Sequence, residues 1–383
     1  MQRIKRQSQL YLEQADPIIS TWPDNSALFS TILTKDSGLD WILNYFVQMK
    51  GTVIAIQNDN SFEDQFENEH KNKSGKKKLN STRPLLSFLP ERDPIAIGNM
   101  WELCPFINTF DLNREIINTM YENFSDFAID LINNHYYIWT TLHQKDIRGG
   151  NDIHNCYIIG YDLKKKTITI KDHINHGKYA PMELSFDKFN LAHKMFIERT
   201  DAWFKRSGKI LYKTAYMVKT NHYTYSFNIK LMIALIIDYL SSTDSMGFVS
   251  KFRSFDEIYF WGKVKKKVYG VACYDLLQHY LSDLIQNETI PDSRIFTFLV
   301  DHKKLMHLRV EYLYKNNYIS KSPELVESFR QIKEQTITVL NLFLKYQINS
   351  DNTILVQIKG MLNKIKHSEI TGLKKIITLL IHS

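Results

Sequence analysis

The sequence contains little glycine, proline and cysteine. Its 383 residues include 14 Gly, 9 Pro and 3 Cys. Glycine makes up about 4% of the chain, against ~7% in an average protein, which excludes collagen-like, elastic and repeat-rich β architectures. Because residues that interrupt helices are scarce, the composition favours long, continuous helices.

The three cysteines are Cys104, Cys156 and Cys273. Their odd number and wide spacing argue against a disulfide framework or a zinc finger. The N-terminal segment has no apolar run of the kind found in signal peptides. The longest apolar stretch, from Leu231 to Ile237, is far shorter than the ~20 residues that span a bilayer. We therefore expect a soluble cytoplasmic protein with reduced thiols and no membrane partner.

Apolar residues make up 44% of the chain and aromatic residues 13%, enough to bury a large core. Global disorder is therefore excluded. The formal net charge of +8 is only mildly basic. It is consistent with a compositional bias towards Lys, Asn and Ile, or with an anionic partner such as nucleic acid or an acidic carrier protein.

The hydrophobic pattern of the first half predicts helices and strands together. A polar lead-in with a short helix occupies residues 1–22. Ser26 to Lys50 shows helical spacing broken at Asp36-Ser37-Gly38, and Val53 to Ile56 resembles a short strand. Ser61 to Arg83 has an acidic and then a basic block with almost no apolar residue, which predicts a mobile surface loop.

A β-rich region follows a predicted helix that has Ser125 as its N-cap. Its three expected strands are Tyr136 to Leu142, Cys156 to Tyr161 and Thr167 to Asp172, and a further helix is expected over Ser185 to Met195.

Beyond about residue 205 the pattern becomes helical, apart from a strand-like stretch at Lys209 to Val218. The expected helices are Asn228–Ser241, Ser254–Phe260, Val271–Gln286, Ser293–Asn316, Pro323–Gln347 and Thr353–Ser383. We expect an α+β protein with a first domain over residues 1–205 and a mainly helical domain over 206–383.

The segment with the clearest chemical signal begins at His154 and ends at Asp172. His154 opens a predicted buried strand, Gly160-Tyr161-Asp162 forms a turn, and Asp172 closes the next strand. Adjacent antiparallel strands bring both residues to the same end of the hairpin. A carboxylate there can accept the imidazole N–H and orient the ring, which is half of a nucleophilic triad. Alternatively, both side chains are satisfied by solvent.

This segment resembles the papain-like, C39-type cysteine peptidase fold, in which a His, an apolar run, Gly-Tyr-Asp and a strand ending in Asp follow one another. More narrowly, the chain resembles proteins related to the N-terminal domain of the butirosin-biosynthesis acyltransferase, found in thiotemplated (closthioamide-like) peptide assembly pathways. Further matching segments are Trp41–Gln48, Cys104–Ile107, Asp172–Tyr179, Tyr269-Gly270 with Tyr274-Asp275, and Asp301–Met306 with Arg309.

The resemblance implies a papain-like α+β fold, with a small antiparallel sheet packed on helices, and transglutaminase-like chemistry through a cysteine thioester. Such an enzyme takes an acyl or peptidyl group from the phosphopantetheine arm of a carrier protein and passes it to an amine or to water. His154 would be the general base and Asp172 its orienting partner. The expected partner is a carrier protein rather than nucleic acid, and no cofactor of the chain's own is expected.

The nucleophile is the weakest match. A papain-like cysteine stands at the N-terminus of an early helix, where the helix dipole lowers its pKa, and Ser26 to Lys50 contains no cysteine. Cys104 is the only cysteine before His154, and Pro105 after it is compatible with a helix start. Cys104 is therefore either the nucleophile or a small buried hydrophobe.

Four further residues are candidate substrate contacts. Gln48 would be an oxyanion donor, as papain-like enzymes use a Gln ahead of their nucleophile, and His173 lies next to Asp172. His302 and Lys303 would either line the substrate groove or belong to a solvated helix face. A metal site at His173 is not expected, because no Cys or Glu stands at ligand spacing.

Three functions remain open from the sequence. The first is a cysteine-dependent acyltransferase or amide-forming enzyme. The second is a non-catalytic papain-fold component that binds a carrier protein or a peptide, and the third is a cysteine peptidase. The retained His154 and Asp172 favour the first, and the missing early cysteine favours the second over the third.

Overall fold

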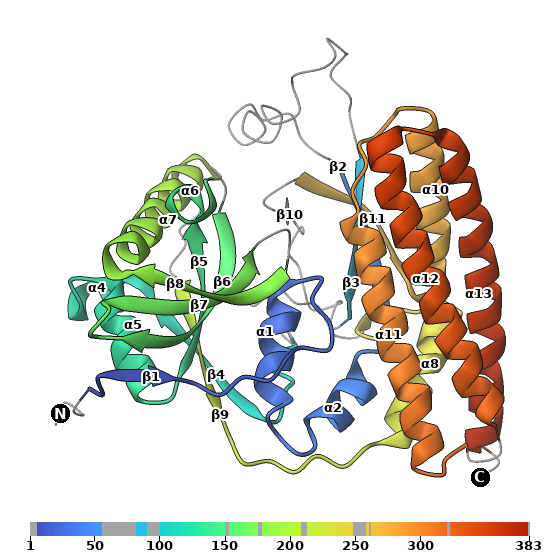
Figure 1. Ribbon diagram of the computed structural model, residues 1–383, viewed down its shortest axis with the longest axis horizontal. Helices are drawn as coiled ribbons and strands as arrows, with labels where there is room; N and C mark the ends of the chain where they lie inside the picture. The colour runs from blue at the N-terminus through green and yellow to red at the C-terminus, as the bar shows by residue number, and fades with distance from the viewer. Residues whose placement is uncertain are drawn as a thin grey trace. The chain divides into compact units, whose positions relative to one another are not determined.

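The structure is a computed structural model of the full chain (Figure 1). It describes residues 6–55, 82–89, 100–149, 153–174, 178–207, 213–247, 258–259, 262–319 and 322–381. The predicted loop over Ser61 to Arg83 lies outside the described residues except for its last two, which begin a strand. Within the described part of the chain, every helix is too short or too polar to cross a membrane.

The chain is an α+β protein that divides into two compact units, both discontinuous in sequence. Unit 1 comprises residues 1–38 and 101–225, and unit 2 comprises residues 39–100 and 226–383. This division does not coincide with the expected boundary near residue 205.

Unit 1 is built on a seven-stranded antiparallel sheet, larger than the small sheet that the sequence predicted. Its path runs through β4 (Ile107–Asn113), β9 (Lys213–Thr220), β5 (Tyr137–His143), β6 (Ile153–Asp162), β7 (Thr167–Ile174) and β8 (Lys178–Ser185), and β1 (Gln9–Tyr11) pairs with β6.

The two faces of this sheet carry different helices. Tyr157 of β6 meets Thr31 of α1 (Pro23–Ile32), their oxygens 3.0 Å apart. Beyond a bulge between Ile158 and Gly160, Tyr161 points to the opposite face and bonds Asn133 of α5 (Phe124–Asn133) at 3.0 Å. The remaining helices of the unit are α4 (Arg114–Met120), α6 (Lys145–Arg148) and α7 (Phe186–Ser207).

Two expectations for unit 1 were wrong, and one strand was not predicted. The lead-in forms the strand β1 rather than a short helix, and its close approach to β6 requires a glycine, because a Cβ on Gly160 would lie 2.8 Å from the Leu10 carbonyl oxygen. The strand β4 stands where Cys104 was expected to lead into a helix. The strand β8 was not predicted, since Pro181 interrupts its pattern; proline is tolerated because β8 is an edge strand.

Unit 2 combines a four-stranded sheet with long helices. The strands, in spatial order, are β10 (Ile258–Tyr259), β11 (Gly262–Tyr269), β2 (Met49–Ala55) and β3 (Thr82–Phe88). The helices are α2 (Gly38–Tyr45, all but its first residue), α8 (Ile229–Ser241), the short η1 (Gly270–Ala272), α10 (Cys273–Ile285), α11 (Arg294–Lys315), α12 (Pro323–Asn349) and α13 (Asn352–Ile381).

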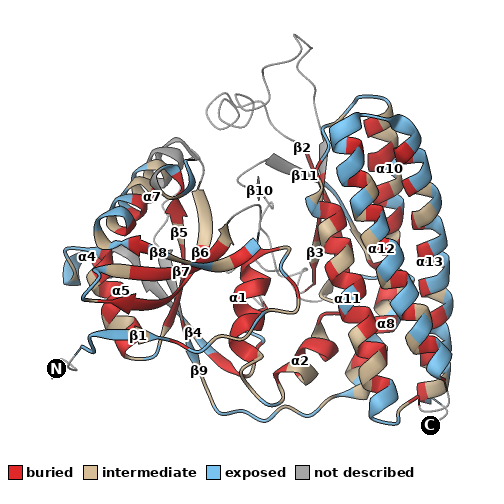
Figure 2. Ribbon diagram, in the orientation of Figure 1, coloured by how far each residue is buried: buried red, intermediate tan, exposed pale blue. Residues whose placement is uncertain are grey.

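The apolar stripes predicted for the second half form the core of unit 2. Buried and exposed faces alternate along α12 and α13 (Figure 2), and α12 packs against both α11 and α13. The prediction of a helix over Ser254 to Phe260 was wrong at the two positions that the structure describes, because Ile258 and Tyr259 form the strand β10. The second half is therefore helical with an added β10–β11 hairpin.

Candidate functional site

His154 and Asp172 lie at the same end of neighbouring strands in unit 1. β6 and β7 are antiparallel, and Ile158 lies opposite Ile170. Because side chains alternate along a strand, His154, Cys156 and Ile158 share one face of the sheet, as do Ile170 and Asp172. The hairpin therefore brings imidazole and carboxylate together, as the sequence spacing predicted.

The pair is close enough to act as one unit. Nδ1 of His154 lies 2.7 Å from Oδ1 of Asp172, at ion-pair distance but without the alignment of a hydrogen bond. Catalytic contacts are often loose until substrate is bound. The Asp172 side chain is fully buried, whereas that of His154 is 30% exposed. With Nδ1 turned to Asp172, Nε2 is the nitrogen left to exchange a proton with a substrate.

A third residue, Arg148 at the end of α6, holds the carboxylate from its other side. Its Nη2 donates to Oδ2 of Asp172 at 3.2 Å, and its Nη1 donates to the carbonyl oxygen of His173. Nε donates to Oε1 of Gln144 at 2.7 Å. The backbone N–H of His173 donates to Oδ1 of Asp172 at 2.6 Å. Both carboxylate oxygens are thus engaged.

His173, a predicted substrate contact, lies beside the pair. Its ring centroid is 6.5 Å from that of His154, and its Nε2 contacts the carbonyl oxygen of Ser20, shortly before α1. Burial lowers the pKa of His173 below its ordinary value. The ring is therefore neutral near pH 7 and is tied to the α1 side of unit 1.

Cys104 does not lie at a helix N-terminus. It is in a turn between Trp101 and β4, and its side chain is 2% exposed. Burial raises the pKa of its thiol to about 12, despite hydrogen bonds from the backbone of Phe106 and Ile107. A thiol with that pKa is not the thiolate that a nucleophile requires at neutral pH.

Cys104 and His154 also lie on opposite faces of the sheet. Trp101 packs its ring edge against Tyr157, with centroids 5.7 Å apart, and the Cys104 N–H bonds the Trp101 carbonyl at 3.3 Å. Tyr157 is three residues after His154 in continuous register with β5, so the two side chains point to opposite faces. This geometry does not support Cys104 as the nucleophile that His154 activates.

The other cysteines are also buried. Cys156 lies on the face of His154 and Asp172, fully buried, and burial together with the Asp172 charge raises its pKa well above the usual value. Cys273 starts α10 in unit 2, where its Sγ lies 3.7 Å from the carbonyl oxygen of Met49. Both are core residues.

Gln48, the predicted oxyanion donor, belongs to unit 2 and is fully buried there. Its Nε2 donates to the Thr243 carbonyl at 2.9 Å and to Oγ of Ser245 at 3.2 Å, while its Oε1 accepts from the Met49 N–H at 3.1 Å. Both amide protons are therefore used within unit 2.

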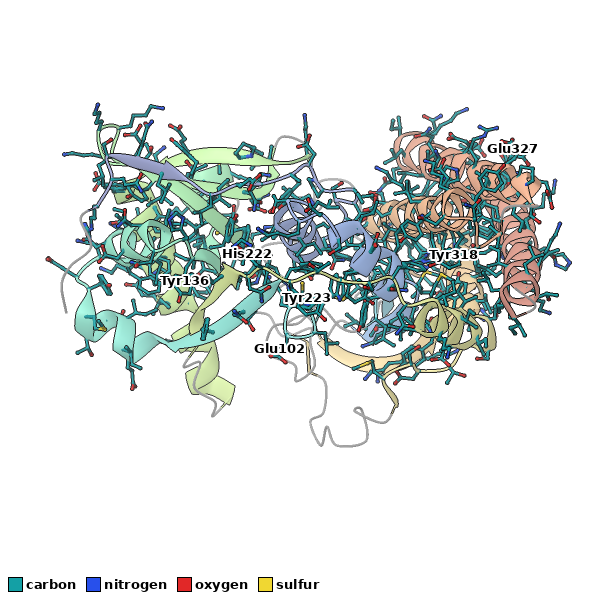
Figure 3. All side chains as sticks on the ribbon, turned by 90° about the horizontal axis from the view of Figure 1, so that it is seen from below. Glu102, Tyr136, His222, Tyr223, Tyr318 and Glu327 are labelled. Carbon is teal, nitrogen blue, oxygen red and sulfur yellow. The ribbon has the colours of Figure 1, made fainter. Side chains whose placement is uncertain are left out.

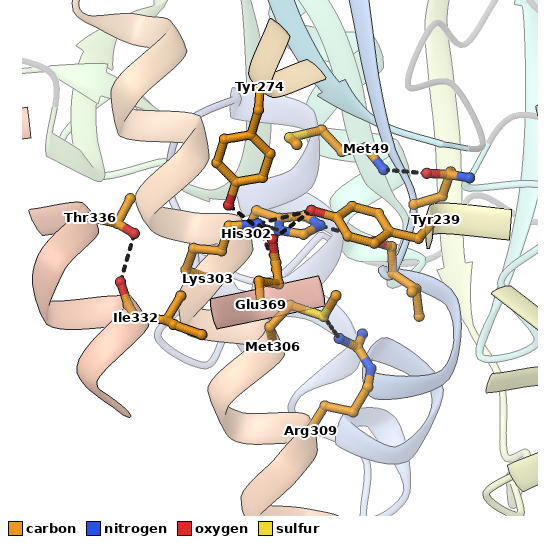
Figure 4. Close-up of polar contacts among 12 residues, drawn as sticks. Met49, Tyr239, Tyr274, His302, Lys303, Met306, Arg309, Ile332, Thr336 and Glu369 are labelled. Carbon is orange, nitrogen blue, oxygen red and sulfur yellow. Dashed lines mark hydrogen bonds and ion pairs between the residues drawn. The ribbon is translucent and has the colours of Figure 1, made fainter. Parts of the chain in front are cut away.

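His302 and Lys303 are not on a solvated helix face, because both side chains are fully buried in unit 2. Figure 4 shows them converging with Tyr239 of α8, Tyr274 of α10 and Glu369 of α13. Nζ of Lys303 lies 2.7 and 2.8 Å from the two carboxylate oxygens of Glu369. Both tyrosine hydroxyls donate to Oε2 of Glu369 at 2.9 Å. The cluster is paired internally.

Glu369 and Arg148 were not predicted from the sequence, although the pattern around Glu369 carries a signal. Glu369 interrupts the apolar stripe of α13 between Ile365 and Leu373, and a charge in such a stripe points to a buried ion pair. Arg148 left no such signal, because its guanidinium acts through contacts with the end of β7. Its side-chain partners depend on the path of α6, which no local pattern reveals.

Among the described residues, no three His, Cys, Asp or Glu side chains are placed to hold a metal ion. No family model matches the chain, and no curated protein matches it significantly.

Proposed function

We propose that the chain is an acyltransferase of the papain-like class, which forms amides from carrier-bound acyl or peptidyl thioesters. The observation that carries the proposal is the buried Asp172 held against a partly exposed His154. A carboxylate in this position orients an imidazole and stabilises its cationic form. An antiparallel sheet with α1 on one face is consistent with that class.

The geometry favours direct attack by the acceptor amine over an enzyme thioester. Nε2 of His154 takes a proton from the attacking amine as the C–N bond forms at the thioester carbonyl. The C–S bond then breaks, and the pantetheine sulfur receives the proton from the imidazolium. The amine thus replaces the cysteine nucleophile of the family, and a buried Cys104 is no obstacle. The +8 charge suits an acidic carrier protein.

A second candidate is the non-catalytic component that binds a carrier protein or a peptide. One specific observation favours it: all three cysteines are buried, so no thiol in the conformation described is ready for covalent catalysis. The two candidates make opposite predictions for turnover.

The test is an assay of amide formation from an acyl-pantetheine thioester and a primary amine, in which the released free thiol is measured. We expect His154→Ala and Asp172→Asn to lower kcat about 100-fold or more, within the range for general bases. His222→Ala is the matched control, since His222 is an exposed histidine of unit 1 (Figure 3) and should leave the rate unchanged.

Cys104→Ala separates the two mechanisms in the same assay. Direct attack predicts that this variant keeps its rate, whereas loss of activity in a folded Cys104→Ala protein would restore the thiolate route. If the unaltered protein binds acyl-carrier protein yet releases no thiol with any amine, the non-catalytic candidate is the correct one.

A further inference from the structure

We infer that Arg148 is a positioning residue, which fixes Asp172 so that only its Oδ1 is presented to His154. The inference rests on the proposed function for its catalytic consequence, but its structural core concerns the His154–Asp172 pair alone. Nothing in the sequence motif of the hairpin assigns a role to this side chain.

Arg148 is anchored at three points that belong to two different elements. Nε bonds Gln144, the residue before α6, whose side chain is 1% exposed. Nη1 and Nη2 bond the His173 carbonyl and the Asp172 carboxylate of β7. Gly149 follows with a φ of +78°, which ends α6 and lets the chain turn away. The planar guanidinium therefore ties the end of α6 to the end of β7.

This contact differs from an ordinary surface ion pair. Asp172 is fully buried and the Arg148 side chain is only 29% exposed. Of the Asp172 oxygens, Oδ1 serves His154 and the His173 N–H, while Oδ2 is bonded by Arg148. Without the guanidinium, the buried Oδ2 loses its hydrogen bond, and the carboxylate is then held through Oδ1. A lysine cannot reproduce the fork, because it offers one point charge instead of several fixed N–H groups.

The charged and titratable groups around His154 come from three elements. They are Asp172 and His173 on β7, Arg148 on α6, and the thiol of Cys156 on its own strand. Arg148 is the only fixed cation among them. Its removal would leave the buried carboxylate of Asp172 without a fixed cation beside it.

The experiment compares full-length Arg148→Ala, Arg148→Lys and Arg6→Ala. Arg6 is the matched control, because it is an arginine of unit 1 that also bridges two carboxylates, Asp130 at 2.6 Å and Asp126 at 3.1 Å, and neither is part of the pair. The first readout is the NMR chemical shift of the His154 ring at one fixed pH, assigned by the signal that disappears in His154→Ala. The second is kcat and KM for amide formation, measured at the same pH.

We expect Arg148→Ala to move the NMR signal of the His154 ring and to lower kcat at least tenfold with little change in KM, since a misplaced base costs rate more than binding. Guanidinium ion added to Arg148→Ala should recover part of kcat. Arg148→Lys keeps the positive charge, but its kcat should stay close to that of Arg148→Ala. Arg6→Ala should change neither readout.

The inference is overturned if Arg148→Ala leaves the His154 ring signal and kcat as Arg6→Ala leaves them. Should Arg148→Ala fail to fold, an Arg148→Lys protein with an unmoved His154 signal and normal kcat overturns it equally. A moved His154 signal in a protein that turns over no thioester leaves the positioning role standing and removes the acyltransfer proposal. The two proposals therefore fail independently.

Discussion

At the scale of single residues, burial determines how His302 is protonated. Its ring is fully buried in unit 2 and is stacked on Tyr239 and Phe88, with interplanar angles of 20° and 22°. Nε2 lies 2.9 Å from the Val47 carbonyl oxygen, so it must carry the proton and donate it. Nδ1, 3.1 Å from Nζ of Lys303, accepts from the ammonium group. These partners fix a neutral imidazole.

The neutral ring makes the stability of the protein depend on pH. Burial, with the charge of Lys303 as a second cause, lowers the pKa of His302 well below its ordinary value. In the unfolded chain the same histidine takes up a proton near pH 6.5. The unfolded state therefore binds more protons than the folded state below that pH, and stability is lost as the pH falls.

We predict that urea unfolding at pH 7.5 and pH 5.5 will show this loss as a difference between variants. From pH 7.5 to 5.5, the unaltered protein should lose about 1.4 kcal/mol more of its unfolding free energy than His302→Gln does. His279→Gln changes an exposed histidine of α10 and should keep the pH dependence of the unaltered protein. Equal pH dependence in His302→Gln would contradict a neutral, buried His302.

Some residues of these networks could be predicted from the sequence, and others could not. His154 and Asp172 were found because a hairpin converts an 18-residue spacing into contact, which needs only local pairing. Cys104 was assigned from its order in the chain, but the face of a sheet that a turn covers depends on long-range packing. Lys303 and Glu369 are 66 residues apart on different helices, so their pairing is equally nonlocal.

At the scale of secondary-structure elements, α13 contains two glycines in contrasting surroundings. A Cβ on Gly372 would lie 2.7 Å from Cε2 of Phe329 on α12, whereas a Cβ on Gly360 would meet nothing within 4 Å. Gly372 is buried and Gly360 is exposed. Only Gly372 is therefore needed for close packing of the two helices.

Alanine at each position should consequently have opposite effects. Gly360→Ala should stabilise the protein by about 0.5–1 kcal/mol, because alanine loses less backbone entropy in a helix. Gly372→Ala gains the same propensity but forces the Phe329 ring to move, and a net destabilisation of about 1–3 kcal/mol is expected. Thermal unfolding monitored by circular dichroism measures the stability of both variants. A Gly372→Ala protein as stable as Gly360→Ala would show that the Phe329 ring moves aside at little cost in free energy.

The accuracy of the element predictions follows from the source of each signal. The helices α10 to α13 agree with their predicted ranges within a few residues. A long apolar stripe can be recognised in the sequence without knowing which element packs against it. The strand β11 was not predicted, because Lys265, Lys266 and Lys267 are exposed and interrupt the alternation of apolar and polar residues that marks a strand. A strand of this kind is recognised only by its pairing with β2.

At the scale of the whole molecule, the chain passes between its two units three times, after residues 38, 100 and 225. A linear division at residue 205 removes β9 from unit 1. β9 lies between β4 and β5 in the sheet, and Val218, fully buried, is opposite both Thr109 and Tyr137. The change to a helical pattern after residue 205 therefore marked a change of composition and not the edge of a compact unit.

The last prediction concerns where unit 1 ends. Residues 1–205 alone should not fold cooperatively, because the loss of β9 deprives β4 of its partner and exposes an edge of β5. Residues 1–225 contain every strand of the sheet, together with residues 39–100 of unit 2, and the sheet should show a cooperative thermal transition and near-ultraviolet circular dichroism. Val218→Pro in the 1–225 chain is the length-matched control, since proline removes a ladder N–H and should abolish the transition. Cooperative unfolding of residues 1–205 would show that the sheet forms without β9.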